Sequence, residues 1–235
     1  MQLFYNSNIQ TSTKQFTFDK TESRHIVRVL RKKEGDTVFI TNGFGSLFTS
    51  KIIIANDKKC LVQIVSFETI EKPWNYYLHI AIAPTKLNDR FEWFLEKATE
   101  IGIDEITPII CDHSERKVVK LERMEKIIHS AAKQSLKNHF PKLNEPISFK
   151  QFMDSTFEGQ LFIAHCEETD KKSLKNELEL GSNITILIGP EGDFSRKEIN
   201  LSLEHNFIPV SLGNSRLRTE TAGVIAAHSV AFINE

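Results

Sequence analysis

The sequence predicts an α/β protein in which a small β-rich unit precedes a larger unit with a mostly parallel sheet. Residues 1 to about 70 hold short strand-like runs separated by turns. After residue 75, apolar runs alternate with amphipathic helical stretches, which is the pattern of βαβ units. Between these regions, residues 71–75 (Glu-Lys-Pro-Trp-Asn) are polar, contain a proline and show no periodicity. We therefore place a boundary there and expect domains 1–72 and 73–235.

Composition places the chain among ordinary globular proteins. It has 235 residues, of which 40% are hydrophobic and 26% charged, enough for one large or two modest domains. It lacks an apolar stretch of 18 residues and the layout of a secretory signal, so we expect a cytoplasmic protein without membrane spans. The net charge of −1 argues against non-specific coating of nucleic acid. Its three cysteines are widely spaced without a C-x-x-C pair, so neither a metal site nor a disulfide framework is expected.

The first unit is expected to contain a hairpin and one helix. The helix begins near Asp19, a good N-cap residue that Glu22 follows three positions later. Asn42 to Gly45 form a turn between two strand-like runs, which favours a hairpin. The expected strands are residues 16–18, 36–41, 48–54 and 60–65.

A basic cluster on this helix, residues 24–33, has two interpretations. Such a run is commonly a solvated helix face. It is also suited to contacting phosphates, because the guanidinium group of Arg binds phosphate through two hydrogen bonds.

The second unit is expected to contain five strands and four main helices. Gly102 is placed as a left-handed residue that ends the first helix. Ser195 and Glu198 have the spacing of a capping box, and Thr219 is placed as the N-cap of the last helix. Residues 167–181 are charged and are expected to form a loop with a short helix. The expected strands are residues 77–83, 106–110, 161–165, 184–188 and 207–211, and the expected helices are residues 88–101, 121–139, 196–204 and 220–233.

Two glycine-containing turns in the last quarter of the chain, within residues 185–195 and 210–223, predict a pocket. Each turn follows an apolar strand, so each places bare backbone at the carboxyl edge of a parallel sheet, where open α/β sheets bind ligands. Neither turn has the spacing of a dinucleotide fingerprint or a P-loop. Arg216, Arg218 and Glu220 lie beside the second turn, and Glu191 lies in the first. These observations predict a small-molecule pocket with adjacent charged groups.

At these turns the chain resembles the knotted SPOUT class of S-adenosylmethionine-dependent RNA methyltransferases. Within that class it is most similar to the bacterial 16S ribosomal RNA (uracil-N3)-methyltransferase family. The residues that carry the resemblance are Ile-Gly-Pro-Glu-Gly at 188–192 with Phe194 and Ser195, Leu212-Gly213, Leu-Arg-Thr-Glu-Thr-Ala at 217–222, and stretches 25–31, 35–36, 96–102 and 131–135.

The resemblance implies a deep trefoil knot in the C-terminal domain, which is a rare exception to the rule that chains are unknotted. It also implies a homodimer, S-adenosyl-L-methionine bound in the knot, and an N-terminal PUA-like β-barrel that helps to hold RNA. The chain departs from the family pattern at two places. Leu136-Lys137 replaces the frequent Gly-Arg, which keeps the charge but not the planar fork of Arg. Asp193 replaces a frequent Gly, and Asp tolerates a positive φ better than most residues.

The implied reaction is methyl transfer to N3 of a uridine in 16S ribosomal RNA. The modest charge of the chain favours the assembled 30S subunit as the substrate, since shape would then add to charge in recognition. The imide proton at N3 must leave before attack, and a cation stabilises the resulting anion. Arg218 is the first candidate for that cation. Glu220 and Glu191 are both candidates for the general base, and the sequence does not rank them.

Cofactor contacts are expected to come mainly from backbone, and no metal is expected. His165 and Cys166 end a strand and either line the same crevice or pack in the core. The expected cofactor-binding residues are Leu187, Gly189, Pro190, Gly192, Leu212, Gly213, Leu217, Thr221 and Ala222. The expected RNA-binding residues are Arg24, His25, Arg28, Arg31, Lys133 and Lys137, the last two within a basic segment that runs from residue 116 to residue 142.

Two other functions are compatible with the sequence. One is a SPOUT methyltransferase that acts on a different RNA position, such as a ribose 2′-OH, which needs no imide deprotonation. The other is a non-catalytic RNA-binding factor for ribosome assembly. The intact glycine turns count against the second, because a protein without a cofactor has no need of them.

Overall fold

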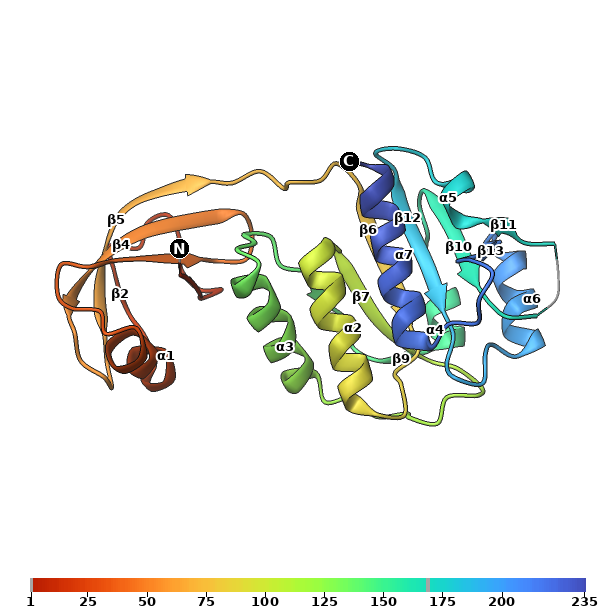
Figure 1. The fold of residues 1–235 in the computed structure, drawn as a ribbon, viewed down its shortest axis with the longest axis horizontal. Coiled ribbons are helices and arrows are strands. Elements are labelled where there is room, and N and C mark those ends of the chain that lie inside the picture. Colours follow the sequence, from red (N-terminus) through yellow and green to blue (C-terminus); the bar gives the residue numbers. More distant parts are fainter. Residues whose placement is uncertain (1, 168–169) are drawn as a thin grey trace. The chain divides into compact units, whose positions relative to one another are not determined.

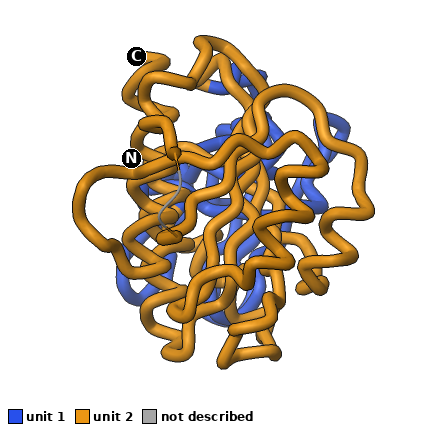
Figure 2. Tube along the Cα trace, turned by 90° about the vertical axis from the view of Figure 1, so that its right-hand side faces the viewer, with its two compact units in different colours: residues 1–72, 132–140 blue, residues 73–131, 141–235 orange. Residues whose placement is uncertain are grey.

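The computed structural model describes residues 2–167 and 170–235, which divide into two compact units (Figures 1 and 2). One unit contains the chain up to residue 72 together with residues 132–140. The other contains residues 73–131 and 141–235. Contacts therefore assign a short segment from the middle of the chain to the N-terminal unit.

The N-terminal unit is a curled five-stranded sheet around a small apolar core. Its strand order is β1-β3-β4-β5-β2, with β1 parallel to β3 and the other pairs antiparallel. The four expected strands and the hairpin are confirmed, whereas β1 was not predicted because three residues are too few to show a period. The core includes Phe4, Ile26, Ile40 and Phe48. The strands are β1 (Leu3–Tyr5), β2 (Gln15–Thr17), β3 (Thr37–Thr41), β4 (Ser46–Ile54) and β5 (Leu61–Thr69).

The helix of this unit begins as expected but ends early. Asp19 caps α1 (Lys20–Arg24) by accepting a hydrogen bond of 2.8 Å from the backbone N–H of Glu22. The chain continues as a π-helical segment, η1 (His25–Val29), and Arg31 has a φ of 54°. The basic cluster therefore extends past the helix instead of forming one helical face.

The C-terminal unit is a parallel sheet with helices on both faces (Figure 1). Its strand order is β11-β13-β10-β12-β6-β7-β8, and β9 also pairs with β7. The mostly parallel sheet is confirmed, because the strand pairs among its described residues are parallel. The strands are β6 (Tyr77–Ile82), β7 (Glu105–Ile110), β8 (Lys142–Leu143), β9 (Ile147–Ser148), β10 (Gln160–Ala164), β11 (Lys172–Ser173), β12 (Asn183–Ile188) and β13 (Ile208–Ser211).

Two apolar clusters form the core of this unit, one on each face of the sheet. The first packs Ile80 and Ile186 against α2 (Asn88–Ile101), α7 (Thr219–Ile233) and the apolar side of α3 (Leu121–Gln134). The second packs Ala81 and Leu187 against α4 (Phe149–Met153) and α6 (Arg196–Glu204). Side chains alternate between the two faces along each strand, which explains why neighbouring residues belong to different clusters. No helix within residues 2–167 and 170–235 is long and apolar enough to span a membrane.

The helix expected at residues 121–139 is shorter than predicted, because α3 ends at Gln134. Leu136 adopts a φ of 56°, and the N–H of Lys137 bonds to the carbonyl of Ala132 at 2.9 Å, the pattern of a Schellman cap. The next residues bond to the hairpin turn of the N-terminal unit: Gly45 N donates to Asn138 O, and Phe140 N donates to Gly43 O, each at 2.9 Å. After Gln134, hydrogen bonds to the hairpin turn therefore take the place of further helical hydrogen bonds.

Two predicted caps were wrong, and the short elements β8, β9, α4 and β11 were missed. Gly102 has a φ of 134° and a ψ of 100°, so it ends α2 outside the left-handed helical region. Arg218, not Thr219, is the N-cap residue of α7. The capping box of Ser195 and Glu198 is confirmed. The expected loop at 167–181 contains β11 and α5 (Leu174–Glu177), and its residues 168–169 lie outside the described residues.

The ionised carboxylate of Glu105 should stabilise the fold at neutral pH, and this contribution should be lost in acid. Burial raises the pKa of this carboxyl, but hydrogen bonds from Tyr77, Asn144 and Lys142 outweigh it and lower the pKa to about 2. A depressed pKa contributes stability above pH 4.5 that is lost as the pH falls toward 2. Glu105→Gln should therefore lower the free energy of unfolding by about 3 kcal/mol at pH 7 and much less near pH 2.

The measurement is urea unfolding of both proteins between pH 7 and pH 2. Glu125→Gln, a change of an exposed carboxylate in α3, is the matched control. A difference between wild type and Glu105→Gln that stays constant over this range would contradict the prediction.

Candidate functional site

Two adjoining cavities lie at the carboxyl edge of the parallel sheet, where β10, β12 and β13 end. Their volumes are about 340 Å³ and 400 Å³. They share five lining residues, which come from the end of β10, the loop before α7 and the start of α7. The shared residues are Ala164, Cys166, Arg216, Leu217 and Ala222.

The first glycine turn is held in place by Asp193. The N–H of Asp193 bonds to the carbonyl of Pro190 at 2.9 Å, and Asp193 has a φ of 64°, as expected if aspartate takes the place of glycine. Its carboxylate accepts 2.7 Å and 2.9 Å hydrogen bonds from the N–H groups of Cys166 and Phe194. Asp193 therefore ties the end of β10 to the turn after β12.

The second glycine turn follows β13 and leads into α7. Ser211 closes it, because its hydroxyl donates to the carbonyl of Gly213 at 2.9 Å and lies 3.2 Å from the Gly213 nitrogen. Gly213 has a φ of 136°, a conformation that L side chains rarely adopt, and a Cβ there would meet open space. The hydroxyl of Thr219 donates to the carbonyl of Gly189 at 3.0 Å, which joins this turn to the first. The prediction that the two turns form walls of one pocket is confirmed.

The two candidate bases each have a carboxylate oxygen without a described partner, but only Glu191 lines one of these cavities, whereas Glu220 does not. Glu191 accepts a 2.9 Å bond from the backbone N–H of Lys86 on one oxygen. Glu220 is only 7% exposed, and its Oε1 lies 3.8 Å from Nε of Arg90. The Oε2 atoms of Glu191 and Glu220 are buried without a hydrogen-bond partner among the described residues. A buried acceptor without a partner is unfavourable and rare, so both oxygens are candidates for a functional role.

Arg216 and Arg218 line the cavities, and their guanidinium groups are accessible. Both are exposed, and neither takes part in an ion pair within the described ranges. His165 lies at the end of β10, is 8% exposed, and has a buried Nδ1 without a described partner. Burial, followed by the charge of Lys171, lowers the pKa of His165 and keeps its imidazole neutral. His165 and Cys166 line the cavity, which resolves the alternative left by the sequence.

Most residues expected to hold a cofactor lie at this edge of the sheet. Leu187 is fully buried in the apolar cluster beneath the sheet, so its side chain does not reach the cavities. Gly192 lies against His113, whose Cβ would be 3.1 Å from an added Cβ. Thr221 is half-buried and is not among the lining residues. The expected residues that do line a cavity are Gly189, Pro190, Leu212, Gly213, Leu217 and Ala222, together with Glu191 and Arg218. Within the described part of the chain, no cluster of three or more His, Cys, Asp or Glu side chains is arranged to hold a metal ion.

The residues expected to bind RNA all belong to the N-terminal unit, although about a hundred positions separate the two groups in sequence. Lys133 joins them, because its Nζ lies 2.7 Å from a carboxylate oxygen of Glu22, three residues before His25. Arg28 pairs with Asp57 at 2.8 Å. Burial lowers the pKa of Lys137. Arg24 and Arg31 are exposed and have no ion pair in the described residues.

Sequence reasoning missed the side chains that shape the loop after β6. Arg116, assigned by sequence to a phosphate-binding segment, donates instead to backbone carbonyls, from Nη2 to Lys86 at 2.6 Å and from Nε to Thr85 at 3.0 Å. Arg90 was not singled out although it faces Glu220. In the sequence, Arg90 is marked only by its place in the first turn of a predicted helix. Its pairing with Glu220 depends on tertiary structure.

Thr219→Val should weaken cofactor binding by separating the two turns. The substitution keeps the shape of the side chain but leaves the carbonyl of Gly189 without its 3.0 Å hydrogen bond. A buried acceptor without a partner costs about 1–3 kcal/mol. We expect a comparable loss in unfolding free energy and about a tenfold rise in the Kd for S-adenosylmethionine, measured by calorimetry.

Thr219→Ser, which retains the hydroxyl, is the control for this substitution. Equal affinity in the Val and Ser variants would show that the bond between the turns does not shape the pocket.

Comparison with known proteins assigns the fold and the site to a class. The family model for an RNA methyltransferase domain matches residues 72–231, and the model for an RNA methyltransferase PUA domain matches residues 18–65. The structure of a probable rRNA-methyltransferase from Porphyromonas gingivalis is similar with a TM-score of 0.93 and 41% identity, covering 100% of this chain and 98% of that one. A putative methyltransferase from Legionella pneumophila, described in complex with the bound cofactor SAM, has a TM-score of 0.87 and 28% identity over 97% and 96% of the two chains.

A curated relative is more specific. Ribosomal RNA small subunit methyltransferase E from Buchnera aphidicola is 34% identical over 90% of this chain and 86% of its own length. The chain therefore belongs to the family of the small-subunit ribosomal RNA methyltransferases E.

Proposed function

We propose that this protein is an S-adenosyl-L-methionine-dependent methyltransferase that methylates N3 of a uridine in 16S ribosomal RNA. The observation that carries the proposal is the pocket between the two glycine turns, which Glu191 and two exposed arginines line, with the buried carboxylate of Glu220 next in sequence to the lining residue Thr219. The names of the relatives support the ribosomal RNA substrate, and the cofactor-bound Legionella protein supports the methyl donor.

The residues at the pocket fit a methyl donor of this kind. Backbone of Gly189, Pro190, Leu212 and Gly213 would lie against its adenosine and methionine parts, since bare backbone allows close approach. The neutral, unpaired Nδ1 of His165 offers it a further polar contact. When bound, the sulfonium supplies the electrophilic methyl group. Leu217 and Ala222 complete the wall, and we retain Leu187, Gly192 and Thr221 as neighbours of the turns.

The protein's own groups would prepare the uracil. Arg218 would stabilise negative charge on the uracil oxygens after the N3 proton leaves. Glu220 and Glu191 are the candidate bases. The freedom of both Glu220 oxygens from hydrogen bonds supports Glu220 as the first choice, whereas Glu191 also holds the loop at Lys86. Glu220→Gln should then abolish the pH dependence of turnover that belongs to the base, and Glu191→Gln should not.

Modification mapping tests the proposal. Ribosomal RNA from cells with and without the protein is digested to nucleosides and analysed by mass spectrometry. A methyl group on N3 of uridine that requires the protein is the expected result, and a protein-dependent methyl group on a ribose 2′-OH would overturn it. Failure to bind S-adenosylmethionine by calorimetry would favour an RNA-binding assembly factor.

We further propose the assembled 30S subunit as substrate. The net charge of −1 supports recognition by shape in addition to charge. Arg24 and Arg31, with His25, Arg28, Lys133 and Lys137, would hold RNA from the PUA-like unit, and domains 1–72 and 73–235 would divide RNA binding from methyl transfer. Methyl incorporation should be faster on 30S subunits than on naked 16S RNA, and equal rates would contradict this preference.

We also propose a knotted homodimer that works in the cytoplasm. The bond between Thr219 and Gly189 supports a knot, because it places the start of the last helix against the turn after β12. Leu87 and Trp93 support a second copy, since 48% and 42% exposed apolar side chains at the start of α2 are suited to an interface. The mass in solution, from light scattering, should be twice that of the chain. A monomer at micromolar concentration would be evidence against the dimer.

A further inference from the structure

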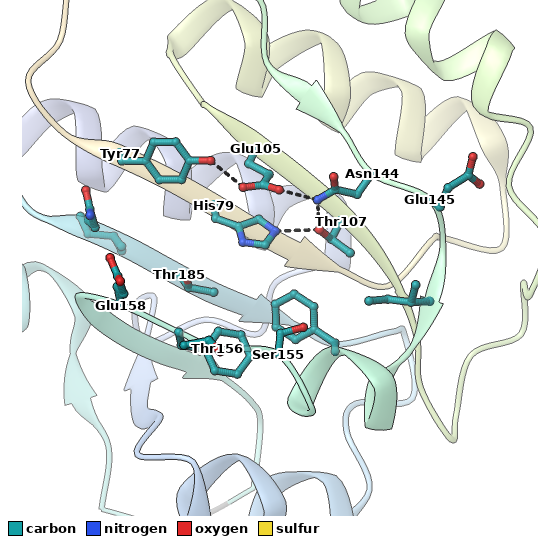
Figure 3. Close-up of a pocket in the computed structure, with 15 residues that line it drawn as sticks. Tyr77, His79, Glu105, Thr107, Asn144, Glu145, Ser155, Thr156, Glu158 and Thr185 are labelled. Carbon is teal, nitrogen blue, oxygen red and sulfur yellow. Dashed lines mark hydrogen bonds between the residues drawn. The ribbon is translucent and has the colours of Figure 1, made fainter.

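A third cavity lies at the opposite edge of the same sheet. Its volume is about 650 Å³, and it is lined where β6, β7 and β12 begin and where the chain leaves α4 (Figure 3). The strands that form the cofactor pocket end at the other edge, so the two sites are separated by the length of the sheet. Helix α4 has only five residues and covers too little of this face to close the cavity.

Several polar side chains line this cavity, on a sheet face that is otherwise apolar. His79 pairs with Thr185 across β6 and β12, and with Glu105 across β6 and β7. Residues in register on neighbouring parallel strands point to the same face, and Thr107, two positions after Glu105, joins them there. Figure 3 shows the His79 ring and the Thr185 side chain beside each other on this face.

The hydrogen bonds around His79 determine which ring nitrogen carries the proton. Asn144 Nδ2 donates to the Thr107 hydroxyl oxygen at 2.7 Å, and that oxygen lies 2.7 Å from Nε2 of His79. Thr107 is 2% exposed, so its own hydrogen needs an acceptor, and Nε2 is the neighbour that provides one. Burial lowers the pKa of His79, which keeps the ring neutral. The proton is therefore on Nδ1, and Nδ1–H has no partner within the described residues.

Thr185 leaves a second group without a partner. The residue is 7% exposed, lines the cavity, and makes no side-chain hydrogen bond to any described residue. It is the register partner of His79. A hydroxyl and an N–H donor thus stand side by side, both unpaired, on the wall of one cavity. Both groups can be reached from the cavity, so together they offer a ligand one donor and one hydroxyl that no described residue occupies.

Two aromatic rings, Phe152 and Phe157, are also among the lining residues. Phe152 meets the His79 ring edge-to-face with centroids 5.5 Å apart, and Phe157 lies 5.2 Å from Phe152. The charged residues in the lining are Glu105, Glu145 and Glu158, and no Lys or Arg is among them. Flat, apolar faces favour an aromatic ligand, and the carboxylates disfavour a phosphate.

We propose that this cavity binds an amino-substituted nitrogen heteroaromatic without phosphate, of the class of a free adenine or cytosine base or its nucleoside. A ring nitrogen accepts from Nδ1–H of His79. The adjacent amino group donates to the Thr185 hydroxyl, and the ring lies against Phe157, because Phe152 is only 3% exposed and packs against His79. This site is independent of the methyl-transfer pocket and of the function proposed for it.

Binding of adenosine to the full-length protein tests the proposal, measured by calorimetry with an excess of S-adenosylhomocysteine present. Adenosine should bind at one site per chain, and AMP about tenfold more weakly because of the carboxylates. Thr185→Val, which removes only the hydroxyl from a strand position, should raise the Kd for adenosine about tenfold. Thr99→Val is the control for loss of a buried threonine hydroxyl elsewhere, since Thr99 has no described partner and lies in α2 outside the cavity.

The same titrations distinguish this proposal from its alternatives. Loss of adenosine binding when S-adenosylhomocysteine is added would place adenosine in the other pocket and overturn the proposal. Equal affinity in Thr185→Val and wild type would overturn it too, as would AMP binding as tightly as adenosine. Uridine, which presents an N–H and two carbonyl oxygens, should bind more weakly than cytidine, and the reverse order would contradict the assigned proton on His79.

Discussion

Replacing Arg218 with alanine is expected to reduce the rate of methyl transfer by about 100-fold or more, with little change in the Kd for S-adenosylmethionine. The side chain is exposed at the cavity and has no ion pair among the described residues, so its charge is available to the substrate. Removing one group that stabilises a developing anion typically lowers turnover by roughly 10²–10³-fold. Single-turnover methylation of 30S subunits, with calorimetry for the cofactor, measures both quantities.

Two variants keep this prediction specific. Arg218→Lys retains the charge but not the planar fork, and should recover part of the activity if charge is what matters. Arg196→Ala removes an exposed arginine of α6 that pairs with Glu167 away from the cavity lining, and should leave turnover unchanged. Full turnover by Arg218→Ala would show that another cation stabilises the anion. A loss that is entirely in cofactor affinity would assign Arg218 to cofactor binding instead.

Replacing Gly223 with valine is expected to lower the free energy of unfolding by about 3 kcal/mol, the upper end for overpacking a core. Gly223 lies in α7, one residue after Ala222 of the pocket wall. A Cβ there would be 2.7 Å from two ring carbons of Phe94 and 2.9 Å from Cδ1 of Ile82. Both neighbours are fully buried, so neither can move aside without disturbing the sheet or α2.

A double-mutant cycle identifies the cause of this loss. Phe94→Leu shortens the side chain that the new methyl groups meet, so Gly223→Val combined with Phe94→Leu should lose less than the sum of the single variants. Urea unfolding measures each free energy. Additive losses would mean that the effect of valine comes from the helix backbone and not from the contact with Phe94.

The order of elements was predictable because each has a local signature. The period of apolar residues in α2, and the alternation of apolar runs and helices around it, depend only on neighbours in sequence. Ser195 and Glu198 were recognised as a capping box for the same reason, since both partners lie within one turn. Failures occurred where long-range bonds competed with local ones. Thr219 has the chemistry of an N-cap, but its hydroxyl bonds to Gly189, thirty positions away.

The ends of helices show the same competition. The apolar pattern of α3 continues past Gln134, yet the chain leaves the helix to bond to the turn of the β3–β4 hairpin. No pattern in the sequence predicted the cavity at the edge where β6, β7 and β12 begin. His79, Thr107 and Thr185 look like isolated polar residues within apolar strands, and only the register of three parallel strands brings them to one face.

The sequence by itself determined the α/β class, the strand–helix alternation, the glycine turns and the resemblance to an RNA methyltransferase family. These features are local patterns or contiguous motifs, so they do not depend on how distant segments meet. The tertiary structure alone decided that Glu191 and Glu220 each keep a buried oxygen without a described partner and that residues 132–140 belong with the N-terminal unit. The physical reason is that hydrogen-bond partners are chosen by proximity in space, and a buried group takes the nearest partner whatever its distance along the chain.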